Sequence, residues 1–158
     1  MMTNDDAASW YRPHNDEDAA HVEEVLSADP AVRVGVAFCT ALGRREEYLE
    51  QLRMLVTPES AEAWGDFASA AALLSNIEDA AYGSIAERAY DDPDVAYLKI
   101  LSGVTEGFQV LEGQPILAAA VVTLVLRDGV PVYGGGRGWL VHSLGVHSRP
   151  EETPHGAY

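Results

Sequence analysis

The stretch Ile116-Leu117-Ala118-Ala119-Ala120-Val121-Val122-Thr123-Leu124-Val125-Leu126 is apolar at nearly every position and carries no charge. The first charged residue, Arg127, follows it directly. A half-buried strand alternates apolar and polar residues, whereas this run is apolar at both its odd-numbered and its even-numbered positions. We therefore expect a strand that is covered on both faces. Helices must cover one face, and a second sheet surface, a pocket or a partner chain must cover the other.

A second β-type run, Arg137-Gly138-Trp139-Leu140-Val141-His142-Ser143-Leu144-Gly145, follows a glycine-rich segment. Asp128-Gly129 between the two runs is a turn signal, so the pair predicts a long antiparallel hairpin that turns there. Shorter strand candidates precede the hairpin at residues 84–90, 95–101 and 108–111.

The first half of the chain has helical periodicity instead. Asp29-Pro30 supplies an N-cap and a proline in the first turn, which predicts a helix that stops at Gly43. Residues 31–38 also alternate like a strand, but no turn signal interrupts them before Gly43, which favours the helix. Further helices are expected at residues 16–28, 44–56, 57–67 and 68–75. Helices followed by a curved antiparallel sheet are the α+β arrangement.

Length and charge restrict the function classes. A chain of 158 residues is the size of one domain, and its net charge of −15 makes nucleic acid and membrane surfaces poor partners. Its single cysteine, Cys39, excludes an internal disulfide. The start of the chain is acidic where a secretion signal is basic, so we expect a cytoplasmic protein. The boundaries we expect are a flexible acidic arm at 1–15, one domain at 16–146 and a flexible tail at 147–158.

Three motifs taken in order suggest a family. They are Leu52-Arg53-Met54-Leu55-Val56-Thr57-Pro58-Glu59-Ser60 at the end of a helix, Trp64-Gly65-Asp66-Phe67 after it, and the Gly-Trp pair that opens the closing strand 137–145. Over residues 17–146 the chain resembles the nuclear transport factor 2-like (cystatin-like, SnoaL-like) superfamily. The resemblance implies a cone in which N-terminal helices pack in the concave face of a curved antiparallel sheet around a pocket. It also implies that the outer sheet face often dimerises.

The same superfamily holds isomerases, cyclases, hydratases, dehydratases and pocket proteins without chemistry, so the fold does not settle the function. Its catalytic members place carboxylates inside the cone. Here the strand candidates 116–126 and 137–145 contain no acidic residue, which lowers the expectation of carboxylate catalysis.

His142 is the best single catalytic candidate. It lies in the middle of a strand, where strict alternation puts it on one face with Leu140 and Leu144. A neutral histidine there is suited to act as a general base near neutral pH. The alternative is a core or interface histidine that one hydrogen bond satisfies.

Six further side chains are candidates for lining a ligand pocket: Trp64, Phe67, Tyr97, Lys99, Gln109 and Thr123. The alternative for the two aromatic residues of 64–67 is core packing, and for the other four it is a place on an outer or solvent face. His142 and His147 point to opposite faces of a strand, and no third ligand is offered, so we expect no metal or other cofactor. The glycine-rich segment 134–138 precedes a strand, which argues against a phosphate loop.

Three hypotheses follow from these residues. The first is a homodimeric cone protein that binds a small apolar or weakly polar ligand without catalysis. The second is a SnoaL-type isomerase or lyase that uses His142 with Tyr97 or Lys99. The third is a non-catalytic dimeric interaction module that works through its acidic arm and the Trp10-Tyr11 pair.

Overall fold

The computed structural model describes residues 29–102 and 118–158. The expected helix at 16–28, the strand candidate at 108–111 and the candidate residue Gln109 lie outside these residues. The described helices come first in the chain: α3 (Pro30–Gly43), α4 (Leu49–Leu55), α5 (Pro58–Trp64) and α6 (Ala68–Ser75). The strands β1 (Ala80–Tyr82), β2 (Glu87–Ala89), β3 (Asp92–Ser102), β4 (Ala120–Val130) and β5 (Gly136–Gly145) follow.

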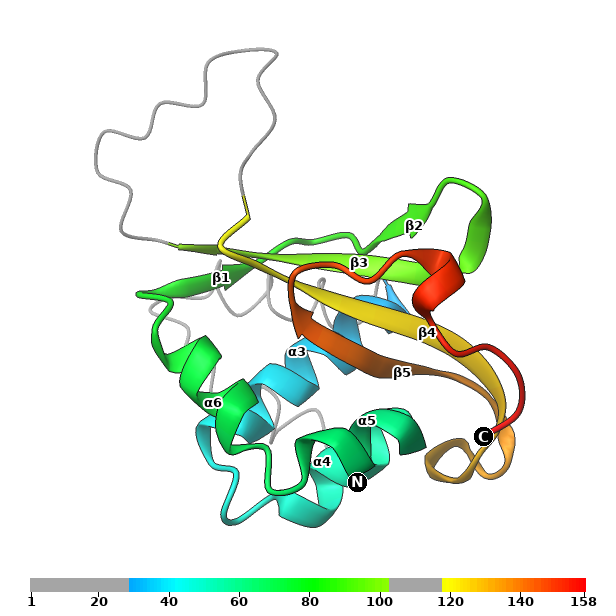
Figure 1. Cartoon of the computed structure of the whole chain (residues 1–158), viewed down its shortest axis with the longest axis horizontal. Helices are drawn as coiled ribbons and strands as arrows, with labels where there is room; N and C mark the ends of the chain where they lie inside the picture. The colour runs from blue at the N-terminus through cyan, green and yellow to red at the C-terminus, as the bar shows by residue number, and fades with distance from the viewer. Residues whose placement is uncertain (1–28, 103–117) are drawn as a thin grey trace, which may run out of the picture.

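The strands form one antiparallel sheet in the order β1-β3-β4-β5, with β2 paired to β3 as well. The sheet is strongly curled, and the helices pack against one of its faces (Figure 1). The expected α+β architecture, with helices before a curved antiparallel sheet, is therefore confirmed. We call the face that meets the helices the inner face and the opposite one the outer face.

Local chemistry explains where the helices begin and end. The Asp29 carboxylate accepts a hydrogen bond from the backbone N–H of Ala31 at 3.0 Å, so the helix predicted for residues 31–43 is confirmed over its strand alternative. The helix expected at 44–56 begins only at Leu49. Gly65 then ends α5 with a φ of 63°, a left-handed conformation that glycine adopts without strain.

The hairpin exists, but its turn was predicted in the wrong place. Strand β4 continues through Asp128 and Gly129, and the register slips by one residue between Arg127 and Val130. The chain reverses in a short 3-10 helix at Pro131–Tyr133. Asp128-Gly129 lies in a bulge rather than in the turn. Gly129, with a φ of 69°, supplies the left-handed residue that such a bulge needs.

Both faces of β4 are covered, as the apolar run predicts. On the inner face Val122 and Leu124 join the core that α3 and β3 complete, and both are fully buried. On the outer face Val125 lies between its cross-strand neighbours Val95 and Leu140, and all three are also fully buried. We call these three residues the outer row.

The chain itself covers the outer row, through residues 146–158, which we call the C-terminal segment. Ser148 donates its N–H to Thr123 Oγ1 at 3.0 Å on one side of the row. On the other side the N–H of Tyr158 binds the carbonyl oxygen of Asp128 at 2.8 Å. The intervening residues therefore cross the row (Figure 1). We expected a flexible tail from residue 147, whereas the structure packs this segment along the sheet.

Replacing Gly138 with alanine is expected to lower the free energy of unfolding by about 1 kcal/mol, because overpacking displaces neighbours. A Cβ at this position would lie 2.0 Å from Cδ2 of Tyr133, whose ring covers the glycine. Urea unfolding of the single and double variants measures this effect. In a Tyr133→Ala background the cost of Gly138→Ala should disappear, and an unchanged cost would show that the two residues are not coupled.

Candidate functional site

His142 lies at a β-bulge in β5. Thr123 pairs with Ser143 and Leu124 pairs with Val141, so His142 is the extra residue between two consecutive pairs. The expectation that His142 shares a face with both Leu140 and Leu144 is therefore wrong. Leu140 lies on the outer face and Leu144 on the inner one, because the extra residue reverses the alternation along the strand.

The start of α5 lies beside this bulge. Val56 forms an isolated parallel bridge with Val141, and the N–H of Thr57 donates to the Val141 carbonyl at 2.9 Å. The Thr57 side chain caps α5 by accepting the N–H of Ser60 at 3.2 Å, with Pro58 at the first helical position. The cap thus turns the hydroxyl groups of Thr57 and Ser60 toward His142, and we call these two residues the hydroxyl pair.

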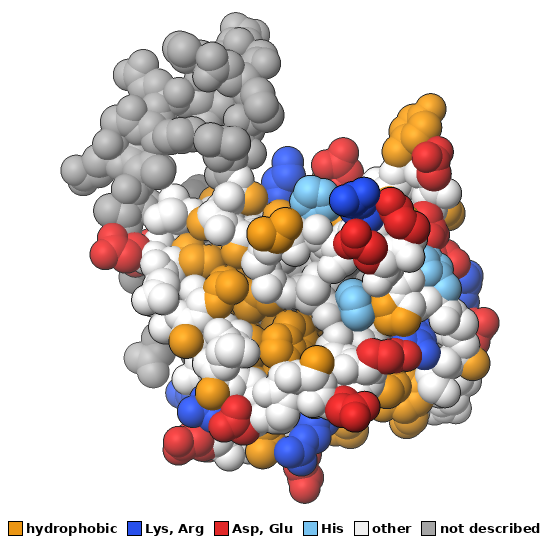
Figure 2. Space-filling view, in the orientation of Figure 1, with side chains coloured by type: hydrophobic (Ala, Val, Ile, Leu, Met, Phe, Trp, Pro, Cys, Tyr) orange, Lys and Arg blue, Asp and Glu red, His pale blue; other side chains and the backbone are white. Residues whose placement is uncertain are grey.

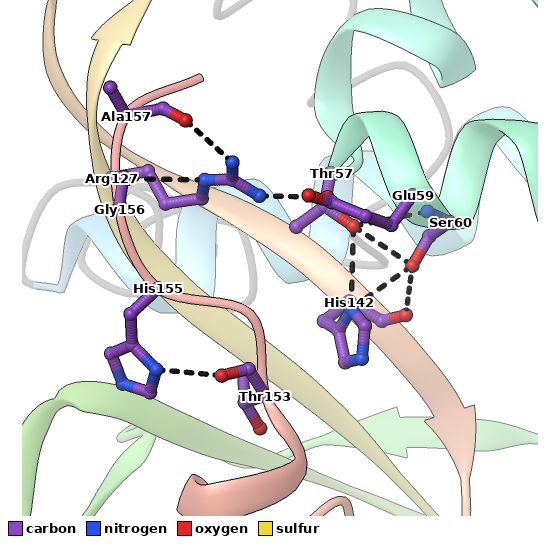
Figure 3. Close-up of polar contacts among 9 residues, drawn as sticks. All are labelled: Thr57, Glu59, Ser60, Arg127, His142, Thr153, His155, Gly156 and Ala157. Carbon is purple, nitrogen blue, oxygen red and sulfur yellow. Dashed lines mark hydrogen bonds and ion pairs between the residues drawn. The ribbon is translucent and has the colours of Figure 1, made fainter.

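Counting protons in this cluster assigns the imidazole tautomer. Ser60 has one hydroxyl proton and donates it to the backbone oxygen of His142, and Thr57 donates its own to Ser60 Oγ at 2.9 Å. His142 Nδ1 lies 3.2 Å from Ser60 Oγ and 3.3 Å from Thr57 Oγ1, and neither oxygen has a proton left for it. With both hydroxyl protons placed in this way, Nδ1 carries the proton and donates to the hydroxyl pair along the contacts drawn in Figure 3.

The other ring nitrogen then holds a free lone pair. Nε2 points away from the hydroxyl pair (Figure 3), and it makes no hydrogen bond with any residue in 29–102 or 118–158. Burial lowers the pKa of His142, and the nearby Arg127 guanidinium lowers it further against the opposing effect of Glu59. The site thus presents a neutral imidazole whose Nε2 can accept a hydrogen bond or a proton.

Ser60 does not have the arrangement of a nucleophile. The residue is 5% exposed, and its hydroxyl proton is bound to a backbone oxygen rather than to an imidazole nitrogen. Its role in the geometry is to hold the His142 ring.

The pKa of His142 gives a testable pH dependence. Because burial lowers this pKa below its ordinary value, the unfolded chain binds more protons than the folded chain in the interval between the two values. The contribution of His142 to stability is complete above the ordinary histidine pKa and is lost as the pH falls through the folded value. Urea unfolding between about pH 7.5 and about pH 5.5 should show this loss, and His142→Gln should remove it.

Carboxylates do not confuse this measurement. Burial raises the pKa of Glu59, but the hydrogen bonds from Arg127 and from the backbone of Glu59, together with the charges of Arg127 and His142, outweigh burial and lower it. The contribution of Glu59 to stability is lost only at a pH below the ordinary pKa of a carboxylate. A variant His142→Gln with the same pH slope as the parent chain would contradict the assignment to His142.

The structure separates the other candidate residues from His142. Tyr97 and Thr123 lie on the outer face under the C-terminal segment, where Tyr97 donates to the Ser148 carbonyl at 2.8 Å. Lys99 lies on the same face and is exposed to solvent. His147 contacts the Tyr97 ring on this outer face. These residues do not converge with His142 on one site.

Trp64 and Phe67 belong to an aromatic cluster with Phe38. The Trp64 ring stacks on Phe38 with centroids 5.3 Å apart, and Phe67 meets both rings. Phe67 is fully buried, which fits the core-packing alternative, whereas Trp64 stays half-buried.

A cleft of about 500 Å³ opens at the end of the sheet where β3 ends and β4 begins. We call it the α6 cleft, and it is lined by Leu73, Asn76, Ile77, Glu78, Ser102 and Ala119. Leu73 also packs against Gly145, three residues beyond His142 on β5 and therefore about 10 Å along the strand. Figure 2 shows apolar side chains in a hollow over the area where α5, α6 and β5 meet.

Sequence reasoning missed the α6 cleft and the hydroxyl pair. The sequence Thr57-Pro58-Glu59-Ser60 marks a helix start, but it does not tell which strand that helix start lies against. Within 29–102 and 118–158, no three His, Cys, Asp or Glu side chains gather to hold a metal ion. None of the helices formed by these residues is long and apolar enough to cross a membrane.

Comparison with protein-family models, with curated proteins and with solved structures finds no match to this chain.

Proposed function

We propose that this chain is a cone-shaped protein of the nuclear transport factor 2-like kind that binds a small, mostly apolar molecule. The ligand would occupy the hollow between α5, α6 and β5, with the α6 cleft as its open end. A volume of about 500 Å³ is within the range of small-molecule sites. The observation that carries the proposal is the His142 ring, whose Nε2 makes no hydrogen bond with the described residues and so offers one polar contact.

The chemistry of this contact selects the ligand. A neutral imidazole with its proton on Nδ1 accepts a hydrogen bond at Nε2, so the ligand should carry one O–H or N–H donor on an apolar body. Both members of the hydroxyl pair have their protons engaged, and they add no second donor.

β-Naphthol is a suitable probe, and β-naphthyl methyl ether is its matched control without the donor. A fluorescence titration should show that the naphthol binds roughly two- to tenfold more tightly than the ether, as expected for one hydrogen bond. His142→Phe should remove this difference while keeping an apolar side chain. Absence of saturable binding by either probe would refute the ligand-binding proposal, and equal affinities would refute the role of His142.

A second candidate function is a proton transfer of the isomerase or lyase type, and the free Nε2 lone pair favours it. Nε2 would remove a proton from a carbon acid, and the imidazolium formed would return it to another carbon of the same substrate. Hydrogen–deuterium exchange at the acidic carbon of β-tetralone tests this step. The chain should accelerate the exchange beyond free imidazole at equal concentration, and His142→Gln should abolish the acceleration.

Dimerisation through the outer face and a cytoplasmic location stay predictions. Any dimer on the outer face has to accommodate the C-terminal segment, which already covers the outer row. The oligomeric state of the full chain in solution, measured by sedimentation, tests the first of these predictions.

A further inference from the structure

Arg127 is the one charged residue among those described that is buried, with 5% of its surface exposed. A guanidinium removed from water needs partners for its N–H groups. Arg127 finds them on two different parts of the chain. Nη1 binds Glu59 Oε2 at 2.8 Å, Nη2 binds the carbonyl oxygen of Ala157 at 2.7 Å, and Nε binds that of Gly156 at 3.3 Å.

The two carbonyl groups belong to the end of the C-terminal segment. Ala157 forms a parallel bridge with Asp128, next to Arg127 on β4. Arg127 therefore binds the part of the segment that is docked beside its own strand. Figure 3 shows the guanidinium between this part of the chain and α5.

The third partner, Glu59, lies in the first turn of α5, next to Ser60 and two residues after Thr57. The ion pair with Arg127 thus holds the helix turn that presents the hydroxyl pair. The contacts of the hydroxyl pair with Nδ1 measure 3.2 and 3.3 Å, at or just beyond the long end for an N–H···O hydrogen bond. A small outward shift of α5 is enough to break them.

We propose that Arg127 is a positioning residue, which couples docking of the C-terminal segment to the tautomer of His142. When Gly156 and Ala157 are in place, the guanidinium stays buried, binds Glu59 and holds the hydroxyl pair against Nδ1. When they leave, two donor groups of Arg127 need water, the side chain turns outward, and its ion pair with Glu59 no longer holds the first turn of α5 in place. The coupling depends on contacts alone, but its consequence for binding rests on the proposed function of His142.

Nuclear magnetic resonance of the isotope-labelled imidazole nitrogens tests the coupling without a ligand. In the parent chain Nδ1 should show the chemical shift of a protonated nitrogen and Nε2 that of an unprotonated one. Removal of residues 154–158, and separately Arg127→Gln, should move both signals toward the average of the two tautomers. Arg127→Lys should give an intermediate result, because it keeps the charge beside Glu59 but not the planar set of donors.

Arg149→Ala is the matched control within the same segment, since Arg149 pairs only with Glu151 and Glu152 among the described residues. It should leave both nitrogen signals unchanged. If removing residues 154–158 also leaves them unchanged in a chain that keeps its β3 and β4 amide signals, Arg127 does not position His142. This truncation retains Arg127, so the test stands even if Arg127→Gln does not fold.

Binding of β-naphthol separates this inference from the proposed function. A chain whose tautomer signals respond to truncation but which binds neither probe supports the coupling and refutes the ligand site. A chain that binds β-naphthol with the same affinity and the same tautomer signals after truncation supports the site and overturns the coupling.

Discussion

Replacing Phe67 with alanine is expected to lower the free energy of unfolding by about 3–5 kcal/mol, the cost of removing a buried phenyl ring. Phe67 is fully buried and contacts both other rings of the aromatic cluster, at centroid distances of 6.3 Å from Phe38 and 5.6 Å from Trp64. Its ring joins α3 to the junction of α5 and α6, so the hollow beside α6 should loosen with it. Urea unfolding followed by circular dichroism measures the loss.

The backbone of Phe67 supplies a sharper control. Its φ of 63° is left-handed, a conformation that disfavours a residue with a Cβ and suits glycine. Phe67→Gly should therefore be no less stable than Phe67→Ala, although glycine is usually the more destabilising of the two. A glycine variant that is less stable by about 1 kcal/mol, the ordinary difference, would contradict the left-handed assignment.

Removing residues 147–158 is expected to lower the free energy of unfolding by on the order of 4 kcal/mol, because it uncovers the outer row. Val95, Val125 and Leu140 are each fully buried, and burying one such side chain contributes roughly 1.5–3 kcal/mol. Part of this gain is offset in the intact chain by the entropy lost when the segment is ordered. Urea unfolding of the truncated chain measures the net effect.

The uncovered row should also make the truncated chain associate, since a contiguous apolar patch on a sheet face seeks a partner. Sedimentation of the truncated chain at increasing concentration tests this. Arg149→Ala changes the same segment without uncovering the row and should stay within about 0.5 kcal/mol of the parent. A truncated chain that is monomeric and as stable as this control would show that something else covers the row.

Periodicity and caps predicted the architecture well. Asp29-Pro30 predicted the start of α3. The run 116–126, which is apolar at odd and even positions alike, predicted a strand covered on both sides. These signals are local, since each depends on the preferences of a few adjacent residues. What covers the outer side could not be predicted, because residues 147–158 have no periodicity and several of their contacts are made by backbone groups that any sequence provides.

The candidate site was predicted only in part, for a similar reason. His142 was found as a polar residue in an apolar strand, but its orientation depends on a bulge between Thr123 and Leu124 that no residue type signals. Its partners Thr57 and Ser60 lie more than 80 positions away in sequence. Tyr97, Lys99 and Thr123 were candidates because they are polar side chains on expected strands, whereas the register places them on the outer face.

The bridge between Val56 and Val141 has a consequence for solubility. A strand at the border of a sheet leaves backbone N–H and carbonyl groups unpaired, and such groups recruit strands of other molecules into fibrous aggregates. Part of the β5 border is already engaged by the connection between α4 and α5. The opposite border is divided between β1 and β2, of three residues each, which are too short to template a second molecule.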